Sequence, residues 1–488
     1  MTVAAEVAAV GHSVVVLERR TDVVESRAGT LLPRVLELFD TRGVAERFIR
    51  KAREIRHWPF NPYHIWAGLQ PVDWRLIESR YPFTLLVPQN YTEEVLQEWA
   101  REGGADIRMG HEVTSIEMHT NGVTIGARTP SGEAVTVAAR YVVGADGARS
   151  TVRKSLEVPF EGHGPTFTGI IADAIMDFPF EGGLKMVGNE LGWGSCFPFG
   201  KRIVRFSIVH AEGRSTPRDV PVTLDEFKRC ITDIYGSDLG CEGLAWASRY
   251  TDQMRIVPSL RKGRAFLVGE SARIHYPASG VGMNFCIQDA FNLGWKLSHV
   301  LSGYAAPELL DTYNEERMAV AQELLQSVKR QCAVQFDFSE EGMAYKRDLE
   351  ARFLPLPEMN RKVGLELNGI GVPYPRSADA HPTVGLRAKD LDLVLLDGTA
   401  SRVYEQLHAR QFVLLDLTGV SITKGLDHLP ASVRVVEAKG VRLPADERDL
   451  QAILIRPDGY VAWASDARPT VQEMREAIGA ATFAAELV

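Results

Sequence analysis

The sequence predicts an α/β protein built around a parallel sheet, and three segments carry this prediction. Residues 1–18, 141–153 and 264–297 each contain a short run of aliphatic, mostly β-branched residues next to a turn or a helix. Strands that are apolar along their whole length are typical of parallel sheets, because helices cover both faces of such sheets. The chain has 488 residues, 45% hydrophobic and 24% charged, which is enough for about three globular domains.

The first segment has the pattern of the second half of a βαβ unit that binds a dinucleotide. Apolar residues at helical spacing precede Gly11, residues 13–17 predict a buried strand, and Glu18 closes that strand. In such units the closing acid accepts hydrogen bonds from ribose hydroxyls. The fingerprint of the first strand and its glycine-rich phosphate loop lies about 20 residues before the acid, so we expect both to be missing from this chain. On these residues alone, an ordinary surface acid is an equal alternative.

The second segment predicts a strand that runs into a tight turn and a helix. We expect the strand at residues 141–144, the turn at Asp146-Gly147, and a helix that Ser150 caps. Glycine in such a turn lets the backbone come close to a ligand. A plain joint between a strand and a helix fits the same residues.

The third segment predicts a strand, a glycine-containing bend and a long amphipathic helix. The strand, at residues 264–268, leads to Gly269-Glu270, Pro277 fixes a bend, and Gly280 and Gly282 precede the helix. The free N–H groups and partial positive charge of a helix start suit an electron-rich carbonyl or a developing anion on a flat ring.

In these segments the sequence resembles the class A flavoprotein monooxygenases, the para-hydroxybenzoate hydroxylase-like family, and most closely the bacterial aromatic polyketide hydroxylases. The resemblance covers essentially the whole chain, and the motifs follow the family's order and spacing. It implies a Rossmann-like FAD-binding domain without its first strand and phosphate loop, an inserted β-sheet substrate domain, and a C-terminal thioredoxin-like domain. The motifs are Glu18-Arg19-Arg20, Ser26-Arg27-Ala28-Gly29-Thr30, Gly144-Ala145-Asp146-Gly147-Ala148-Arg149-Ser150 and residues 277–297.

The resemblance assigns one group of residues to the nucleotide part of FAD. Glu18 is expected at the adenosine ribose, Arg19 beside the adenine and Arg27 near the pyrophosphate. Gln89 matches a glutamine near the ribityl chain. Asp146 and Gly147 match a motif that touches both FAD and the nicotinamide cofactor.

A second group is assigned to the flavin ring. Pro277 is expected beside its reactive face, with Gly280 in the adjoining turn, and the backbone at Gly282, Met283 and Asn284 is expected at its pyrimidine side. The chain departs from the family pattern at Glu270, where the family has aspartate, and at Arg273, where it has histidine. The longer glutamate side chain alters the expected contact with the ribityl chain.

The resemblance also implies domain boundaries. Because all five cysteines precede residue 333, the C-terminal domain has no CxxC motif and cannot exchange disulfides. We therefore interpret it as a structural element or as a contact in a homodimer. The expected FAD-binding domain comprises residues 1–55, 88–160 and 261–335, the substrate-binding domain residues 56–87 and 161–260, the linker residues 336–377, and the thioredoxin-like domain residues 378–488. Prolines at positions 355, 357, 373 and 375 indicate loops in the linker.

Local patterns also predict individual elements. Alternating β-branched and aromatic residues predict strands at residues 166–176, 192–198 and 203–210, and we expect long helices at residues 311–336 and 471–487.

The activity implied is hydroxylation of an aromatic, polyketide-type polycyclic substrate by FAD with NAD(P)H and O₂, through a C4a-hydroperoxyflavin. The cofactor carries this chemistry, so no nucleophile–base pair is required. His275 and Tyr276 are candidates for a base, although a structural histidine fits equally well. Seven aromatic residues within residues 58–83 fit either a substrate wall or an ordinary core. Baeyer–Villiger oxygenation, and a non-catalytic remnant that does not hold FAD, stay as alternatives.

Composition excludes several other classes. The net charge of −8 argues against a broad grip on nucleic acid or anionic membranes. The five scattered cysteines predict neither a disulfide framework nor a metal site. No transmembrane run or secretory signal is evident, so we expect a cytoplasmic protein.

Overall fold

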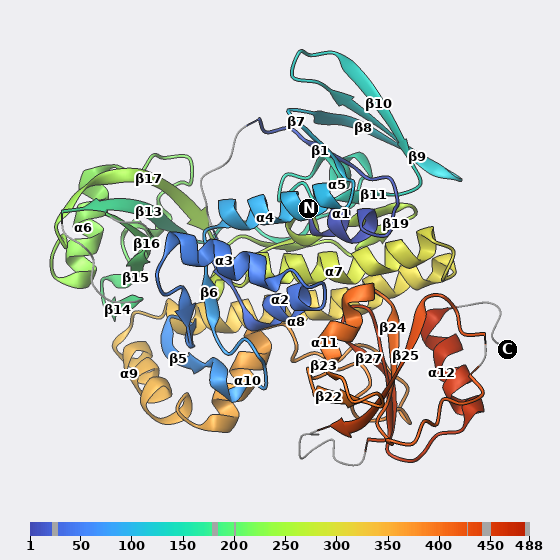
Figure 1. The fold of residues 1–488 in the computed structure, drawn as a ribbon. Coiled ribbons are helices and arrows are strands. Elements are labelled where there is room, and N and C mark those ends of the chain that lie inside the picture. The colour runs from blue at the N-terminus through green and yellow to red at the C-terminus, as the bar shows by residue number, and fades with distance from the viewer. Residues whose placement is uncertain (22–27, 178–183, 200–201, 427, 442–449, 484–488) are drawn as a thin grey trace.

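The computed structural model describes residues 1–21, 28–177, 184–199, 202–426, 428–441 and 450–483 (Figure 1). Arg27 lies outside these residues. The fold is mixed α/β, and one long helix, α7 (Gly282–Leu301), runs through its centre between the other parts of the chain. Fifteen of its residues are buried, so this helix belongs to the core over most of its length.

The part around α7 contains the strands that the sequence predicts at residues 13–17, 141–144 and 264–268, and they take part in two short parallel pairings. β1 pairs with β7 and β11 pairs with β20, in each case in parallel. Among the described residues β1 and β11 belong to separate sheets, and α1 precedes β1 with no strand before it. The elements are α1 (Thr2–Ala8), β1 (Val15–Glu18), α4 (Gln89–Glu102), β7 (Asp106–Met109), β11 (Val142–Gly144), α5 (Thr151–Ser155), β19 (Arg261–Lys262), β20 (Ala265–Leu267) and α8 (Asp311–Gln335).

Smaller pieces complete this part of the molecule. An antiparallel sheet of β10, β9 and β8 projects at the top of Figure 1. The short strands β2, β6 and β3 form a second sheet close to α2 and α3. The bounds are β2 (Thr30–Leu31), α2 (Pro33–Asp40), α3 (Ala45–Ile55), β3 (Phe60–Asn61), β4 (Tyr63–Trp66), β5 (Leu69–Asp73), β6 (Thr84–Leu86), β8 (Glu112–His119), β9 (Gly122–Arg128), β10 (Ala134–Ala139), β12 (Glu161–His163), β18 (Met254–Ile256) and β21 (Arg273–Ile274).

The strand-rich middle of the chain forms a five-stranded antiparallel sheet in the order β14-β15-β16-β13-β17. In β13 (Thr168–Met176) buried and half-buried residues alternate, the pattern of a strand with one face on a core. α6 (Leu224–Tyr235) covers that face, because Phe227, Ile231 and Ile234 recur at helical spacing and pack in one cluster with Phe206. The other strands are β14 (Lys185–Asn189), β15 (Gly192–Pro198), β16 (Ile203–His210) and β17 (Cys241–Thr251).

Residues 336–377, which we expected to form a linker, contain helices that belong to the core. They form α9 (Glu340–Asp348), a π-helical turn and α10 (Pro357–Leu367). Val363 and Leu367 are buried in one cluster with Trp74. The prolines that suggested a loop explain the difference, because Pro357 occupies the first turn of α10, where proline is tolerated.

The C-terminal part is a six-stranded sheet in the order β23-β22-β25-β24-β26-β27. β24 and β25 pair in parallel and the other neighbours are antiparallel. The helices α11 and α12 lie beside the sheet (Figure 1). The elements are β22 (Asp392–Leu395), β23 (Ala400–Arg402), α11 (Val403–Gln406), β24 (Phe412–Asp416), β25 (Val433–Val441), β26 (Ala452–Ile455), β27 (Val461–Ser465) and α12 (Val471–Thr482).

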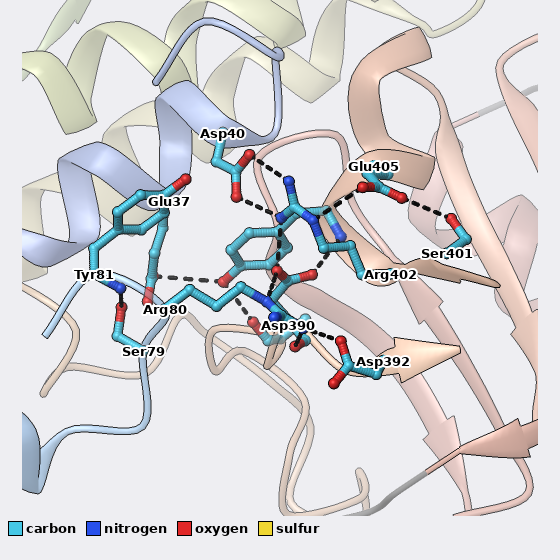
Figure 2. A network of polar contacts seen from close by, with 12 residues as sticks. Glu37, Asp40, Ser79, Arg80, Tyr81, Asp390, Asp392, Ser401, Arg402 and Glu405 are labelled. Carbon is cyan, nitrogen blue, oxygen red and sulfur yellow. Dashed lines mark hydrogen bonds and ion pairs between the residues drawn. The ribbon is translucent and has the colours of Figure 1, made fainter. Parts of the chain in front are cut away.

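Ion pairs join the C-terminal part to the rest of the molecule, and Figure 2 shows one such network. Arg402 donates to both carboxylate oxygens of Asp40 in α2 and also contacts Asp390, at 2.7 Å. Arg80, from the loop before β6, contacts Asp390 at 2.6 Å and also pairs with Asp392. The network therefore ties two N-terminal stretches of chain to a C-terminal stretch more than 300 residues away.

Candidate functional site

One large cavity, of about 2760 Å³, opens between the central part and the five-stranded sheet. Pockets for small ligands usually measure roughly 300–1,000 Å³. The cavity also runs between the edges of β1 and β11, since residues of both strands line it. Every described candidate site residue lines this cavity except Asn284: Glu18, Arg19, Gln89, Asp146, Gly147, Glu270, Pro277, Gly280, Gly282 and Met283.

Glu18 supplies a carboxylate to the cavity wall. Its oxygens accept hydrogen bonds from the backbone N–H of Arg20 at 2.9 Å and from the Arg20 guanidinium at 3.2 Å. Partial burial tends to raise the pKa of Glu18, but the hydrogen bonds from Arg20 outweigh it, and the pKa is lowered. Glu18 is thus ionised at neutral pH and keeps acceptor capacity for hydroxyl groups of a ligand.

Gln89 and the Asp146-Gly147 turn form another part of the cavity wall. The Gln89 side chain accepts from the backbone of Ala28 at 3.2 Å and donates to Glu93 at 2.7 Å. Asp146 accepts from the Val152 N–H in the first turn of α5, at 3.1 Å, beside the predicted N-cap residue Ser150. Gly147 has φ +74°, and no atom lies within 4 Å of where a Cβ would stand. This turn thus presents bare backbone to the cavity.

The turn from Pro277 to Gly280 and the start of α7 also line the cavity. The first α-helical hydrogen bond there joins the Phe285 N–H to the Val281 oxygen at 3.2 Å, so the N–H groups of Gly282 and Met283 precede the helical ladder. These N–H groups border the cavity with the positive end of a 20-residue helix behind them. Such an end stabilises negative charge on a ligand.

Asn284 has a different place from its neighbours. It is fully buried and does not line the cavity. Its side chain accepts from the Leu32 N–H at 2.8 Å and donates to the Thr30 oxygen at 3.2 Å. Asn284 therefore fixes the start of α7 against β2, and its side chain does not face a ligand.

The two departures from the family pattern have distinct surroundings. Glu270 is exposed at the cavity in a short 3₁₀ turn. Arg273 is buried and pairs with Asp289 of α7 at 2.5 Å, and Asp289 also pairs with Arg317 of α8 at 2.8 Å. Burial tends to lower the pKa of Arg273, but Asp289 reverses this and the pKa is raised. The Arg273 charge is thus compensated within the protein.

His275 lies next to the turn from Pro277 to Gly280, and it lines the same cavity. Its Nδ1 lies 2.7 Å from the backbone oxygen of Tyr276. Its ring lies 3.7 Å from the place that a Cβ added to Gly282 would occupy. Burial lowers its pKa to about 4, so the ring is neutral at neutral pH. A neutral imidazole can accept a proton, so His275 has the protonation state that a base requires. Tyr276 beside it is 2% exposed, and burial raises the pKa of its hydroxyl well above the usual range, so this hydroxyl stays protonated.

Aromatic residues of the 58–83 stretch divide between cavity and core. Trp58, Phe60 and Tyr63 line the cavity, and Trp58 is 68% exposed. Trp74 is fully buried in the core. Part of this stretch therefore belongs to the core and part lines the cavity, and the role of the lining part as a substrate wall stays a prediction.

Sequence reasoning did not single out several polar lining residues. Arg205 of β16 pairs with Asp173 through two bonds of 2.7 Å and lies 3.8 Å from the Phe199 ring centroid. A charge between the buried neighbours Val204 and Phe206 was the available signal. His64, Tyr250 and Gln335 also line the cavity, and no local pattern marks them.

The arrangement fits FAD. An ionised carboxylate at a strand end, an open glycine turn and a helix start all line this one cavity, and these are features with which proteins hold a dinucleotide. Within the described residues no group of histidine, cysteine or acidic side chains could hold a metal ion. Nor does any described helix have the length and apolarity needed to span a membrane.

Comparisons with known proteins agree with this geometry. Residues 1–328 match the family model of the FAD binding domain, and residues 381–483 match that of the aromatic-ring hydroxylase C-terminal domain. A 12-dehydrotetracycline 5-monooxygenase/anhydrotetracycline 6-monooxygenase of Streptomyces rimosus is 36% identical over 95% of this chain and 92% of its own. A rifampicin monooxygenase of Streptomyces venezuelae is also 36% identical, over 97% and 95%.

The solved structures extend the likeness to three dimensions. The anhydrotetracycline hydroxylase of Streptomyces rimosus has a TM-score of 0.87 and 34% identity, over 99% of this chain and 96% of that one. The predicted family is therefore confirmed. The chain belongs to the class A FAD-dependent aromatic hydroxylases and is a flavoprotein monooxygenase.

Proposed function

We propose that this monooxygenase hydroxylates a polycyclic aromatic substrate of the polyketide type, with NAD(P)H as reductant and O₂ as oxidant. The observation that carries this proposal is the single cavity that joins the nucleotide-side residues to an aromatic-lined chamber. The named tetracycline and rifampicin monooxygenases support the choice of a large polycyclic substrate. Aromatic walls such as those of this cavity accommodate flat, electron-rich rings.

The chain's residues divide the work along the cavity. Glu18 accepts hydrogen bonds from the adenosine ribose, and Gln89 and Asp146 contact the middle of the cofactor. The N–H groups of Gly282 and Met283 stabilise negative charge on the reduced ring. Bound FAD, once reduced, activates O₂ for transfer of one oxygen atom.

The inserted five-stranded sheet and residues 56–87 act as the substrate domain. Trp58, Phe60 and Tyr63 hold the substrate ring from one side, and Trp193 of β15 borders the same cavity. Enclosure by these aromatic groups excludes water, which otherwise diverts activated oxygen to hydrogen peroxide. The C-terminal part acts as a thioredoxin-like domain without thiols and serves as structural support, because none of the five cysteines lies in it.

The test starts with the purified protein and added FAD. We expect a flavin absorption spectrum after gel filtration, and NADH or NADPH oxidation that anhydrotetracycline, used as a four-ring probe, accelerates. In ¹⁸O₂ the product should carry one heavy oxygen, and NMR should place it as a ring hydroxyl. An ester oxygen inserted beside a carbonyl would instead indicate Baeyer–Villiger oxygenation. Failure to bind added FAD would favour the non-catalytic remnant.

A further inference from the structure

His64 lies where the substrate wall meets the flavin-side turn. It belongs to β4, whose residues Tyr63 and Ile65 line the cavity, and it is itself only 8% exposed. Its Nε2 lies 2.7 Å from the backbone oxygen of Ser279, which belongs to the turn between Pro277 and α7. A residue of the expected substrate domain thus contacts the turn that borders the flavin.

Hydrogen-bond partners determine which nitrogen of His64 carries the proton. The Ser279 carbonyl can only accept, so Nε2 donates and Nδ1 of the neutral ring accepts. Thr84 lies 3.1 Å from Nδ1 and donates its hydroxyl, while Trp74 donates its indole N–H to the Thr84 oxygen at 2.7 Å. Burial lowers the pKa of His64 to about 4, in agreement with a neutral ring. A directed chain of donors therefore runs from Trp74 to the turn.

Ser279 is held in a backbone conformation that serine rarely adopts. Its φ is +51°, in the left-handed region that favours glycine. Its hydroxyl donates to Gln331 of α8 at 2.7 Å, and the Gln331 amide donates to Ser327 at 3.1 Å. The turn is therefore held on two sides, by His64 through the carbonyl and by Gln331 through the hydroxyl.

We propose that His64 is a positioning residue for the flavin, acting by holding the Ser279 carbonyl so that Gly280 and Gly282 keep their places beside the ring. This inference rests on the proposed function of the cavity as the FAD site. It also gives the substrate wall a direct connection to the cofactor turn, because β4 carries both His64 and the lining residue Tyr63.

The variants separate a positioning role from simple packing. His64→Leu keeps the bulk and removes the donor, whereas His64→Gln keeps an amide donor near the position of Nε2. His299→Leu is the matched control, because His299 is also a buried histidine, with its Nε2 3.0 Å from a backbone oxygen, but does not line the cavity. Thr84→Val keeps the imidazole and removes its orienting donor, and it serves if His64→Leu fails to fold.

The first measurement is hydrogen exchange by mass spectrometry on protein without cofactor. We expect faster exchange in residues 278–283 for His64→Leu, near-normal exchange for His64→Gln, and no change there for His299→Leu. The second is FAD titration, in which His64→Leu should raise Kd about tenfold, equivalent to one buried hydrogen bond of roughly 1.4 kcal/mol, and alter the visible flavin spectrum.

Two outcomes overturn the inference: unchanged exchange in residues 278–283 of His64→Leu or Thr84→Val, or an unchanged Kd and flavin spectrum in a variant whose turn has loosened. The exchange result does not depend on flavin. If the unaltered protein binds no FAD, the proposed function fails and so does the positioning role, whereas failure of the inference alone leaves FAD binding by the unaltered protein intact.

Discussion

Replacing Glu316 by glutamine should destabilise the whole molecule, because its carboxylate joins two helices to the C-terminal part. Glu316 lies in α8 and is 6% exposed. It contacts Lys296 at 2.7 Å and Asn292 at 2.6 Å, both in α7, and Arg456 at 2.6 and 2.9 Å from the turn between β26 and β27. The substitution leaves Lys296 buried without its partner carboxylate.

The magnitude follows from the pKa of Glu316. Burial tends to raise this pKa, but Arg456 and Lys296 outweigh it and lower it from 4.5 to about 2. At 1.36 kcal/mol per pKa unit, the ionised group contributes roughly 3 kcal/mol to the free energy of unfolding. Because the pKa in the folded state is the lower one, this contribution is complete above pH 4.5 and is lost as the pH falls toward 2.

Thermal unfolding followed by circular dichroism provides the assay. Unfolding entropy of about 2.1 cal/mol/K per residue gives roughly 1 kcal/mol/K for a chain of this length, so we expect Tm to fall by ~3 °C at pH 7. Glu323→Gln is the control on the same helix, because its pair with Arg330 is exposed and contributes at most ~1 kcal/mol. Equal Tm values for the two variants at pH 7, or equal acid sensitivity of Glu316→Gln and the unaltered protein, would refute the reasoning.

Three further predictions concern other parts of the molecule. Glu18→Gln should raise the Kd for FAD about tenfold in fluorescence titration, through a weakened ribose contact, while the exposed Glu117→Gln leaves it unchanged. Gly385→Ala should lower Tm far more than Gly236→Ala, although both glycines have φ near +80°. A Cβ added at Gly385 would lie 2.4 Å from a backbone oxygen, whereas a Cβ added at Gly236 would have no neighbouring atom within 4 Å. The fully buried Cys196 thiol should resist Ellman's reagent at pH 8 until guanidinium is added, because burial raises its pKa to about 11; rapid labelling of Cys196 in the native protein would contradict this.

Elements with one clear periodicity could be predicted from the sequence. The alternation predicted strands at residues 192–198 and 203–210, and β15 and β16 have these bounds. The long helix predicted over residues 311–336 is α8, Asp311–Gln335. Such patterns are local, because each residue's face follows from the repeat of its own element. The helix predicted to close the chain at residues 471–487 begins as expected and is described to Thr482.

The site was predictable where local backbone chemistry defines it. Glycines in turns and an acid at a strand end can be recognised from the residues next to them in sequence. Glu18, Gly147 and Gly282 were predicted in this way, and all three line the cavity. Asn284 and His64 show the limit, because their partners lie 252 and 215 residues away. No window of sequence contains both members of such a contact, so the pattern could not distinguish Asn284, which binds β2, from Met283, which lines the cavity.

Buried ion pairs between distant residues also explain why a C-terminal part without thiols belongs to the flavin-binding core. Carboxylates of α2 and α8 form ion pairs with arginines of the C-terminal part: Asp40 pairs with Arg402 (Figure 2), Glu37 with Arg387 and Glu316 with Arg456. These carboxylates are almost fully buried, and a buried charge that loses its partner costs several kcal/mol. At roughly 3–5 kcal/mol each, three such losses would together be about as large as the 5–15 kcal/mol by which most domains are stable. A chain cut after residue 377 should therefore fail to fold instead of yielding a smaller active enzyme.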